Sequence, residues 1–143
     1  MRAVNLREIE IGMESFMLGG DAFFTIKNLM RDQRFTYWVQ RCENKPTLYF
    51  VKVLNGPDNT RNYRFFGIIV QEGGQAKYFY SRKSAKIVEN SPSVQFFQEF
   101  WNNRNRLNQY WEAWSEGKCC KCHRKLTSEW ANVGIGPVCA GKE

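Results

Sequence analysis

The chain has 143 residues, enough for one ordinary domain or for a domain with a small appendage. Hydrophobic residues make up 43% of it and aromatic residues 15%, which predicts a packed core and excludes a disordered chain. The formal net charge of +7 is the kind of excess found on proteins that face a polyanion.

No stretch approaches the roughly 18 uninterrupted apolar residues of a membrane-spanning helix, so we expect no membrane contact. Residues 1–10 lack the apolar centre of a secretory signal. The five cysteines are an odd number, and four of them gather near the C-terminus. This spacing favours metal-bound thiolates in a reducing compartment over a disulfide framework, and we predict a cytoplasmic protein.

Residues 1–20 form a lead-in segment without clear periodicity, which ends at a pair of glycines. Segments rich in aromatic and β-branched residues follow, with polar turn residues at 44–46 and 55–59 between them. We expect strands over 21–29, 34–41, 47–54, 63–70 and 76–80. Together these segments predict a meander of four or five antiparallel strands.

A helix is expected to begin near Pro92, which suits a first helical position, after a cap by Asn90 or Ser91. Val94, Phe97 and Trp101 then recur on one stripe, which is typical of a helix packed on a sheet. Whether residues 107–114 continue the helix or run extended stays open.

The predicted fold is therefore α+β: an antiparallel sheet with a packed helix, followed by a small treble-clef-like zinc finger. The expected division is a lead-in at 1–20, a β-rich domain with its helix at 21–114, and a zinc-finger-like domain at 115–143.

The C-terminal cysteines have the spacing of a zinc site. Cys119 and Cys122 form a C-x-x-C pair that can aim two sulfurs at one point, and Cys139 can add a third from another element. Residues 126–132 are expected to form a short hairpin. The Gly-Ile-Gly-Pro segment at 134–137 is expected to start a terminal helix with Cys139 in its first turn, where free N–H groups favour a thiolate.

The fourth ligand is left open by the sequence. The position three residues after Cys139, a usual place for a ligand, is a lysine. His123 is the preferred candidate by ligand chemistry; Cys120, Cys42, water or a side-chain oxygen are the alternatives. Cys42 is at the end of a predicted strand, where a small core residue is the simpler interpretation.

Residues 117–127 and 134–140 resemble a zinc-finger-like domain of unknown function found in many phage, plasmid and actinobacterial proteins. Its pattern is C-x-x-C-G-R-x-L-T followed by G-I-G-P-x-C, and the chain departs from it at Cys120 and at His123, where the family usually has glycine. Members often carry a histidine shortly before the pair, and the resemblance suggests that this ligand has moved to His123. It implies a mobile-element origin and a zinc ion, and no particular activity.

Two basic runs without acidic residues lie at 73–88 and 117–128. The first also holds aromatic residues, and this mixture is typical of surfaces that stack bases and track phosphates. The predicted nucleic-acid contacts are Lys77, Tyr78, Tyr80, Arg82, Lys83, Lys86, Lys118, Lys121, Arg124 and Lys125. In the simpler interpretation the aromatics of 78–80 belong to a strand with alternate side chains in the core, and Phe79 is the residue expected to point inward.

The predicted function is nucleic-acid binding, with a single-stranded or RNA-containing target in a phage or mobile element. The alternative is a phage factor that binds a host protein complex and inhibits or redirects it. We expect no enzymatic activity, because the single histidine and the lack of P-loop, G-x-S-x-G, H-E-x-x-H and H-x-E motifs leave no recognisable catalytic set.

Overall fold

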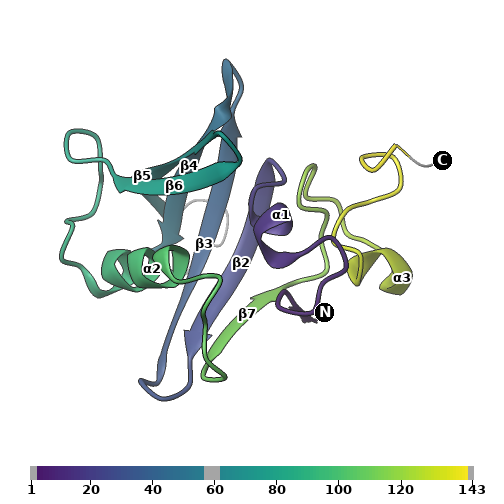
Figure 1. Ribbon diagram of the computed structural model, residues 1–143, viewed down its shortest axis with the longest axis horizontal. Helices are drawn as coiled ribbons and strands as arrows, with labels where there is room; N and C mark the ends of the chain where they lie inside the picture. The colour runs from purple at the N-terminus through teal and green to yellow at the C-terminus, as the bar shows by residue number, and fades with distance from the viewer. Residues whose placement is uncertain (1–2, 57–61, 142–143) are drawn as a thin grey trace.

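In the computed structural model, which describes residues 3–56 and 62–141, the strands form one antiparallel sheet in the order β1-β7-β2-β3-β4-β5-β6 (Figure 1). The strands are β1 (Val4–Asn5), β2 (Asp21–Asn28), β3 (Gln33–Cys42), β4 (Lys45–Leu54), β5 (Tyr63–Glu72), β6 (Gln75–Tyr80) and β7 (Trp111–Ser115). The helices are α1 (Met13–Met17), α2 (Pro92–Asn102) and α3 (Ser128–Ala131).

The predicted sheet-rich α+β class is confirmed, and β2 to β6 follow one another as the expected meander. Helix α2 begins at Pro92, with Ser91 as N-cap in extended conformation but without a side-chain capping hydrogen bond. Part of the turn predicted at 55–59 lies outside the described residues.

The open question about residues 107–114 is resolved by β7, which inserts between β1 and β2. Trp111, Ala113 and Ser115 are buried while Glu112 and Trp114 between them are only half-buried, so the segment has the period of a strand. The lead-in also contains regular structure, because Val4 pairs with Ser115 and residues 13–17 form α1. The division into three units remains a prediction; the described residues share one hydrophobic cluster that includes Leu6 and Cys120.

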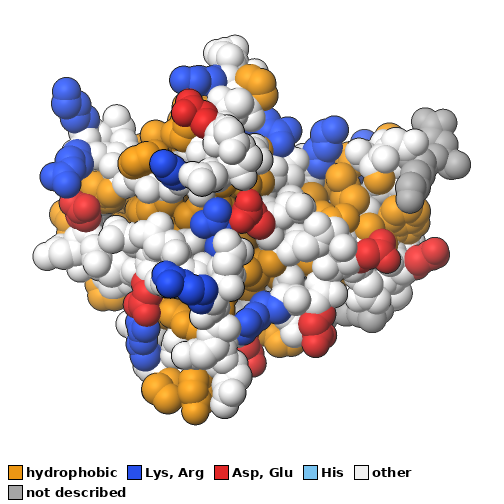
Figure 2. Space-filling view, viewed as in Figure 1, with side chains coloured by type: hydrophobic (Ala, Val, Ile, Leu, Met, Phe, Trp, Pro, Cys, Tyr) orange, Lys and Arg blue, Asp and Glu red, His pale blue; other side chains and the backbone are white. Residues whose placement is uncertain are grey.

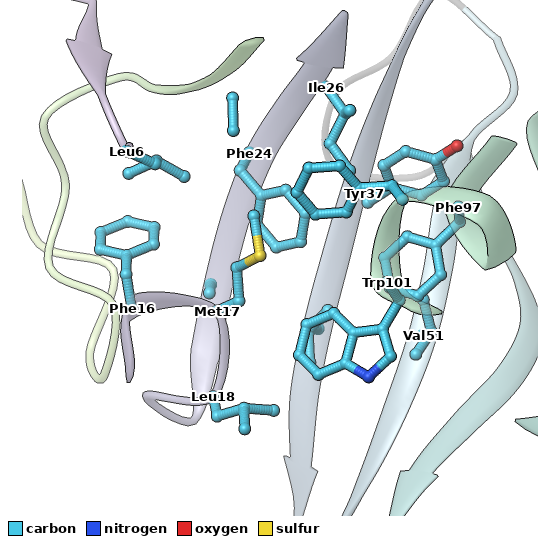
Figure 3. Close-up of a cluster of buried hydrophobic side chains, with 14 of the residues drawn as sticks. Leu6, Phe16, Met17, Leu18, Phe24, Ile26, Tyr37, Val51, Phe97 and Trp101 are labelled. Carbon is cyan, nitrogen blue, oxygen red and sulfur yellow. The ribbon is translucent and has the colours of Figure 1, made fainter. Parts of the chain in front are cut away.

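Helices α1 and α2 cover the same face of the sheet, which we call the inner face (Figure 3). Phe16 and Met17 come from α1, and Phe97 and Trp101 from α2; all are buried. Two hydrogen bonds fix α2 there: Trp101 Nε1 donates to the carbonyl of Ala76 at 3.0 Å, and the Tyr37 hydroxyl donates to the carbonyl of Ser93 at 2.6 Å.

The opposite, outer face of the sheet is covered by neither α1 nor α2, and it carries aromatic side chains that are only half-buried. Phe23 and Trp38 are paired across β2 and β3, and their rings stack with centroids 4.9 Å apart. Tyr63 contacts both rings edge-on at 5.6 Å. Lys52 places its Nζ 3.9 Å from the centroid of the Trp38 ring. We call Phe23, Trp38 and Tyr63 the outer aromatic cluster.

Candidate functional site

Three of the predicted ligands come together in the structure. The sulfurs of Cys119, Cys122 and Cys139 all lie within 4.8 Å of one another. Zinc–sulfur bonds of about 2.3 Å in a tetrahedron require sulfurs about 3.8 Å apart, so a small adjustment of side chains would suffice to hold an ion. The arrangement can therefore bind a metal ion.

A tight hairpin over residues 117–126 aims the first two sulfurs. The amide of Cys119 donates to the carbonyl of Arg124 at 2.8 Å, and the amide of Leu126 donates to the carbonyl of Gly117 at 3.0 Å. The chain reverses at His123, whose φ of 63° is in the left-handed region that favours glycine. We call residues 117–126 the knuckle.

The third sulfur comes from a single turn, not from the first turn of a helix. The amide of Ala140 donates to the carbonyl of Gly136 at 2.9 Å, but among the residues described up to 141 no helix follows. The hairpin predicted for 126–132 is also wrong, because α3 occupies residues 128–131. Thr127 is the N-cap of this short helix, which begins at Ser128. A treble-clef fold is not confirmed.

Backbone amides stabilise the thiolate form of Cys119, which is the form that binds a metal. The amides of Lys121 and Gly136 each donate to Cys119 Sγ at 3.4 Å. Burial acts to raise the pKa of Cys119, but these donors and the amide of Cys122 outweigh it and lower the pKa. Hydrogen bonding to Cys122, followed by burial, raises the pKa of Cys139 to about 11. A metal must therefore displace protons as it binds.

Cys120 is a packing residue. It is 1% exposed, and burial, followed by the charge of Cys119, raises its pKa to about 12. A Cβ on Gly19 would clash with its sulfur, so this glycine, two residues after the end of α1, makes room for it. Its amide donates to the carbonyl of Gly134 at 3.1 Å, which joins the knuckle to the C-terminal segment. Neither Cys120 nor Cys42 belongs to the three-sulfur group.

The structure does not bring His123 into the three-sulfur group. Its ring packs on Phe23 of the outer aromatic cluster, with centroids 4.0 Å apart. Burial, together with the charge of Lys118, lowers the pKa of His123 and favours the neutral imidazole. The identity of the fourth ligand stays a prediction.

The predicted basic contacts fall in two clusters at different parts of the sheet. The first cluster is exposed on β6 and the loop after it: Lys77, Arg82, Lys83 and Lys86. The second belongs to the knuckle, exposed except for the half-buried first member: Lys118, Lys121, Arg124 and Lys125. On the side of the molecule that carries α2, blue and red side chains are interspersed, so no large area of one sign lies there (Figure 2).

The aromatic contacts predicted on β6 need correction. Tyr78 is 9% exposed and its ring packs on Phe97 at 5.3 Å, so it offers no face to a base. Phe79, expected in the core, is 51% exposed. Tyr80 is half-buried and its hydroxyl donates to the carbonyl of Ile87 at 2.8 Å. Gly67 leaves room for the inward Tyr78 ring, because a Cβ there would lie 2.6 Å from it.

The outer aromatic cluster is the feature that the sequence interpretation missed. Phe66, another aromatic residue of the same sheet, is fully buried in the core and does not belong to the cluster. The available signal was the alternation in β2, where Ala22 and Phe24 are buried and Phe23 points the other way. The alternation alone does not say which face the helices cover.

Comparison with known proteins adds no relative: no family model, curated protein or solved structure matches the chain. Within the described residues, no helix is both long and apolar enough to cross a membrane.

Proposed function

We propose that this protein is a zinc-containing, single-strand nucleic-acid-binding protein of a phage or mobile element. The observation that carries the proposal is the outer aromatic cluster, which lies on the sheet face that α1 and α2 leave uncovered. It is bordered by the basic knuckle, because His123 packs directly on Phe23. Aromatic rings beside cations are the pairing that binds unstacked bases and the phosphates that link them.

Zinc is the metal that the donor set favours. Thiolates select zinc, copper(I) or iron–sulfur clusters over magnesium or calcium, and zinc commonly takes three or four such ligands in a tetrahedron. The order of a C-x-x-C knuckle and a later cysteine beside a Gly-Pro turn also fits a treble-clef-like finger. In this proposal zinc is structural: it holds the knuckle so that its cations lie beside the outer face.

A single strand fits the distance between the two basic clusters. The knuckle follows β7 and the other cluster lies on β6, five strands away in the sheet order. At about 4.8 Å per strand the separation is about 24 Å, a span for several nucleotides. The outer aromatic cluster lies between the two basic clusters. Its rings can contact the unstacked bases of a single strand, whereas a duplex keeps its bases stacked inside the helix.

We expect binding to single-stranded DNA or RNA to weaken steeply with salt. For single strands the logarithm of affinity falls by about 0.7 per phosphate contact for each unit of log salt concentration. The double variant Lys121→Ala/Lys125→Ala should therefore reduce that slope by about 1.4. Fluorescence anisotropy with labelled oligonucleotides, measured across a salt series, gives the slope directly.

The matched control is Lys45→Ala, which removes an equally exposed cation at the start of β4, outside both clusters. It should leave the slope unchanged. Affinity that does not depend on salt, or a loss of slope equal in the control and the knuckle variant, would rule out the proposed phosphate contacts.

One observation favours the alternative of a protein-binding factor. Leu29 and Met30, at the tip of the β2–β3 hairpin, are 55% and 69% exposed. Apolar side chains at an exposed tip can anchor a protein partner. A pull-down from a nuclease-treated host lysate tests this alternative. A captured host complex that is lost in Met30→Asp but kept in Lys121→Ala/Lys125→Ala would support it over nucleic-acid binding.

A further inference from the structure

A cavity of about 250 Å³ lies between the outer face of the sheet and the knuckle. Strands β2, β3 and β7 supply its floor, and the chain from Ser115 to His123 forms one wall. The lining residues that matter here are Thr25, Thr36, Tyr63, Trp114, Glu116 and Lys118. The cavity therefore joins the two features that the proposed function uses, the aromatic cluster and the basic knuckle.

Its size and its walls suit one flat ring. Pockets for drug-sized ligands measure about 300–1,000 Å³, so this cavity holds a smaller molecule. Tyr63 and Trp114 contribute aromatic surface, whereas the Phe23 ring already packs on Trp38 and His123. Trp114 is held because its Nε1 donates to Glu112 Oε1 at 3.0 Å. Burial, with the charge of Glu116, raises the pKa of Tyr63 to about 12, so its phenol is neutral.

Polar groups in the cavity can bind the edge of such a ring. The hydroxyls of Thr25 and Thr36 lie 2.7 Å apart, so one donates to the other and the second keeps a proton that it can donate to a ligand. The Glu116 carboxylate adds a hydrogen-bond acceptor. Lys118, whose Nζ lies 3.7 Å from Glu116 Oε2, adds a cation.

We propose that this cavity binds a single unstacked nucleobase of the bound strand, whose edge contacts the Thr25–Thr36 hydroxyl pair while Lys118 contacts its phosphate. The inference rests on the proposed function and gives it a defined subsite. Cations elsewhere on the protein contact phosphates only, whereas this cavity requires a base.

The experiment compares a base-bearing oligonucleotide with an abasic strand of the same length and charge. The wild-type protein should bind the abasic strand at least tenfold more weakly. The double variant Thr25→Val/Thr36→Val removes both partners of the hydroxyl pair and keeps their shape, a change that is nearly neutral for stability. It should weaken binding of the base-bearing strand about fivefold to tenfold and leave the abasic strand unaffected. Thr47→Val, an exposed position on β4 outside the cavity, is the control.

A second measurement separates failure of the subsite from failure of the proposed function. A nucleoside monophosphate at millimolar concentration should shift the indole N–H resonance of Trp114, and ribose 5-phosphate should not. Equal affinity for base-bearing and abasic strands, with no shift, would overturn the subsite and leave strand binding standing. A Trp114 shift in a protein that binds no strand would support the cavity and overturn the proposed function.

Discussion

Replacement of Cys119 by serine is expected to abolish zinc binding and to unfold the knuckle and the turn that carries Cys139. Structural zinc contributes about 10–16 kcal/mol to the folding of isolated zinc-finger peptides at neutral pH. The C-terminal segment here is short; Cys120 and Ala131 belong to the main hydrophobic cluster, and Leu126 and Ile135 pack against it only partly buried. We therefore expect the proposed metal to supply much of the folding energy of this segment.

Two measurements check this. Elemental analysis should find one zinc per chain in the wild type and none in Cys119→Ser. Hydrogen exchange should show amides of residues 117–141 losing protection in the variant and after chelation, while those of β3 and β4 stay protected. The amides of Lys121 and Gly136, which donate to the Cys119 sulfur, should exchange among the first.

The other cysteines supply matched controls. Cys42→Ser and Cys120→Ala lie outside the three-sulfur group and should retain one zinc, although Cys120→Ala should also lower stability because it removes a buried side chain. His123→Ala should retain zinc as well, since its ring packs on Phe23. A chain free of zinc that is still protected over residues 117–141 and indifferent to chelators would contradict the metal site.

Strands β2 to β6 could be predicted because each is rich in β-branched and aromatic residues and is bounded by turn residues. Strands β1 and β7 could not. β1 has two residues, too few for any period, and β7 follows a loop of asparagines and arginines that resembles a frayed helix. What defines both is long-range pairing, of β1 with β7 and of β7 with β2, which leaves no local pattern in the sequence.

The candidate site also has a part that the sequence predicts and a part that it does not. Cys119, Cys122 and Cys139 were predictable because tetrahedral metal binding imposes spacings on the sequence. The outer aromatic cluster was not, because a strand with apolar residues on both faces gives no sign of which face the helices cover. For β6 the predicted face was wrong: Tyr78 and not Phe79 points inward, into space that Gly67 on the neighbouring strand leaves open.

The first glycine of the Gly-Ile-Gly-Pro segment is expected to be required for the site, although it is no ligand. Gly134 has a φ of 103°, and a Cβ there would lie 2.7 Å from Ile9 Cδ1 and 3.1 Å from Phe16 Cδ2. Both side chains are buried, so neither can move freely. Strain of about 1–2 kcal/mol and overpacking of about 1–3 kcal/mol predict a loss of about 2–5 kcal/mol in Gly134→Ala. Denaturant unfolding measures the loss.

Gly12 is the control that separates backbone strain from overpacking. Its φ of 91° is similar to that of Gly134, but a Cβ there would meet nothing within 4 Å. Gly12→Ala should therefore lose only the strain, about 1–2 kcal/mol. The larger loss at Gly134 should come with faster release of zinc to a chelator, since the Gly134 carbonyl accepts from the amide of Cys120, next to the first ligand. Equal losses in the two variants would show that the contact with the N-terminal segment does not hold the metal-binding segment in place.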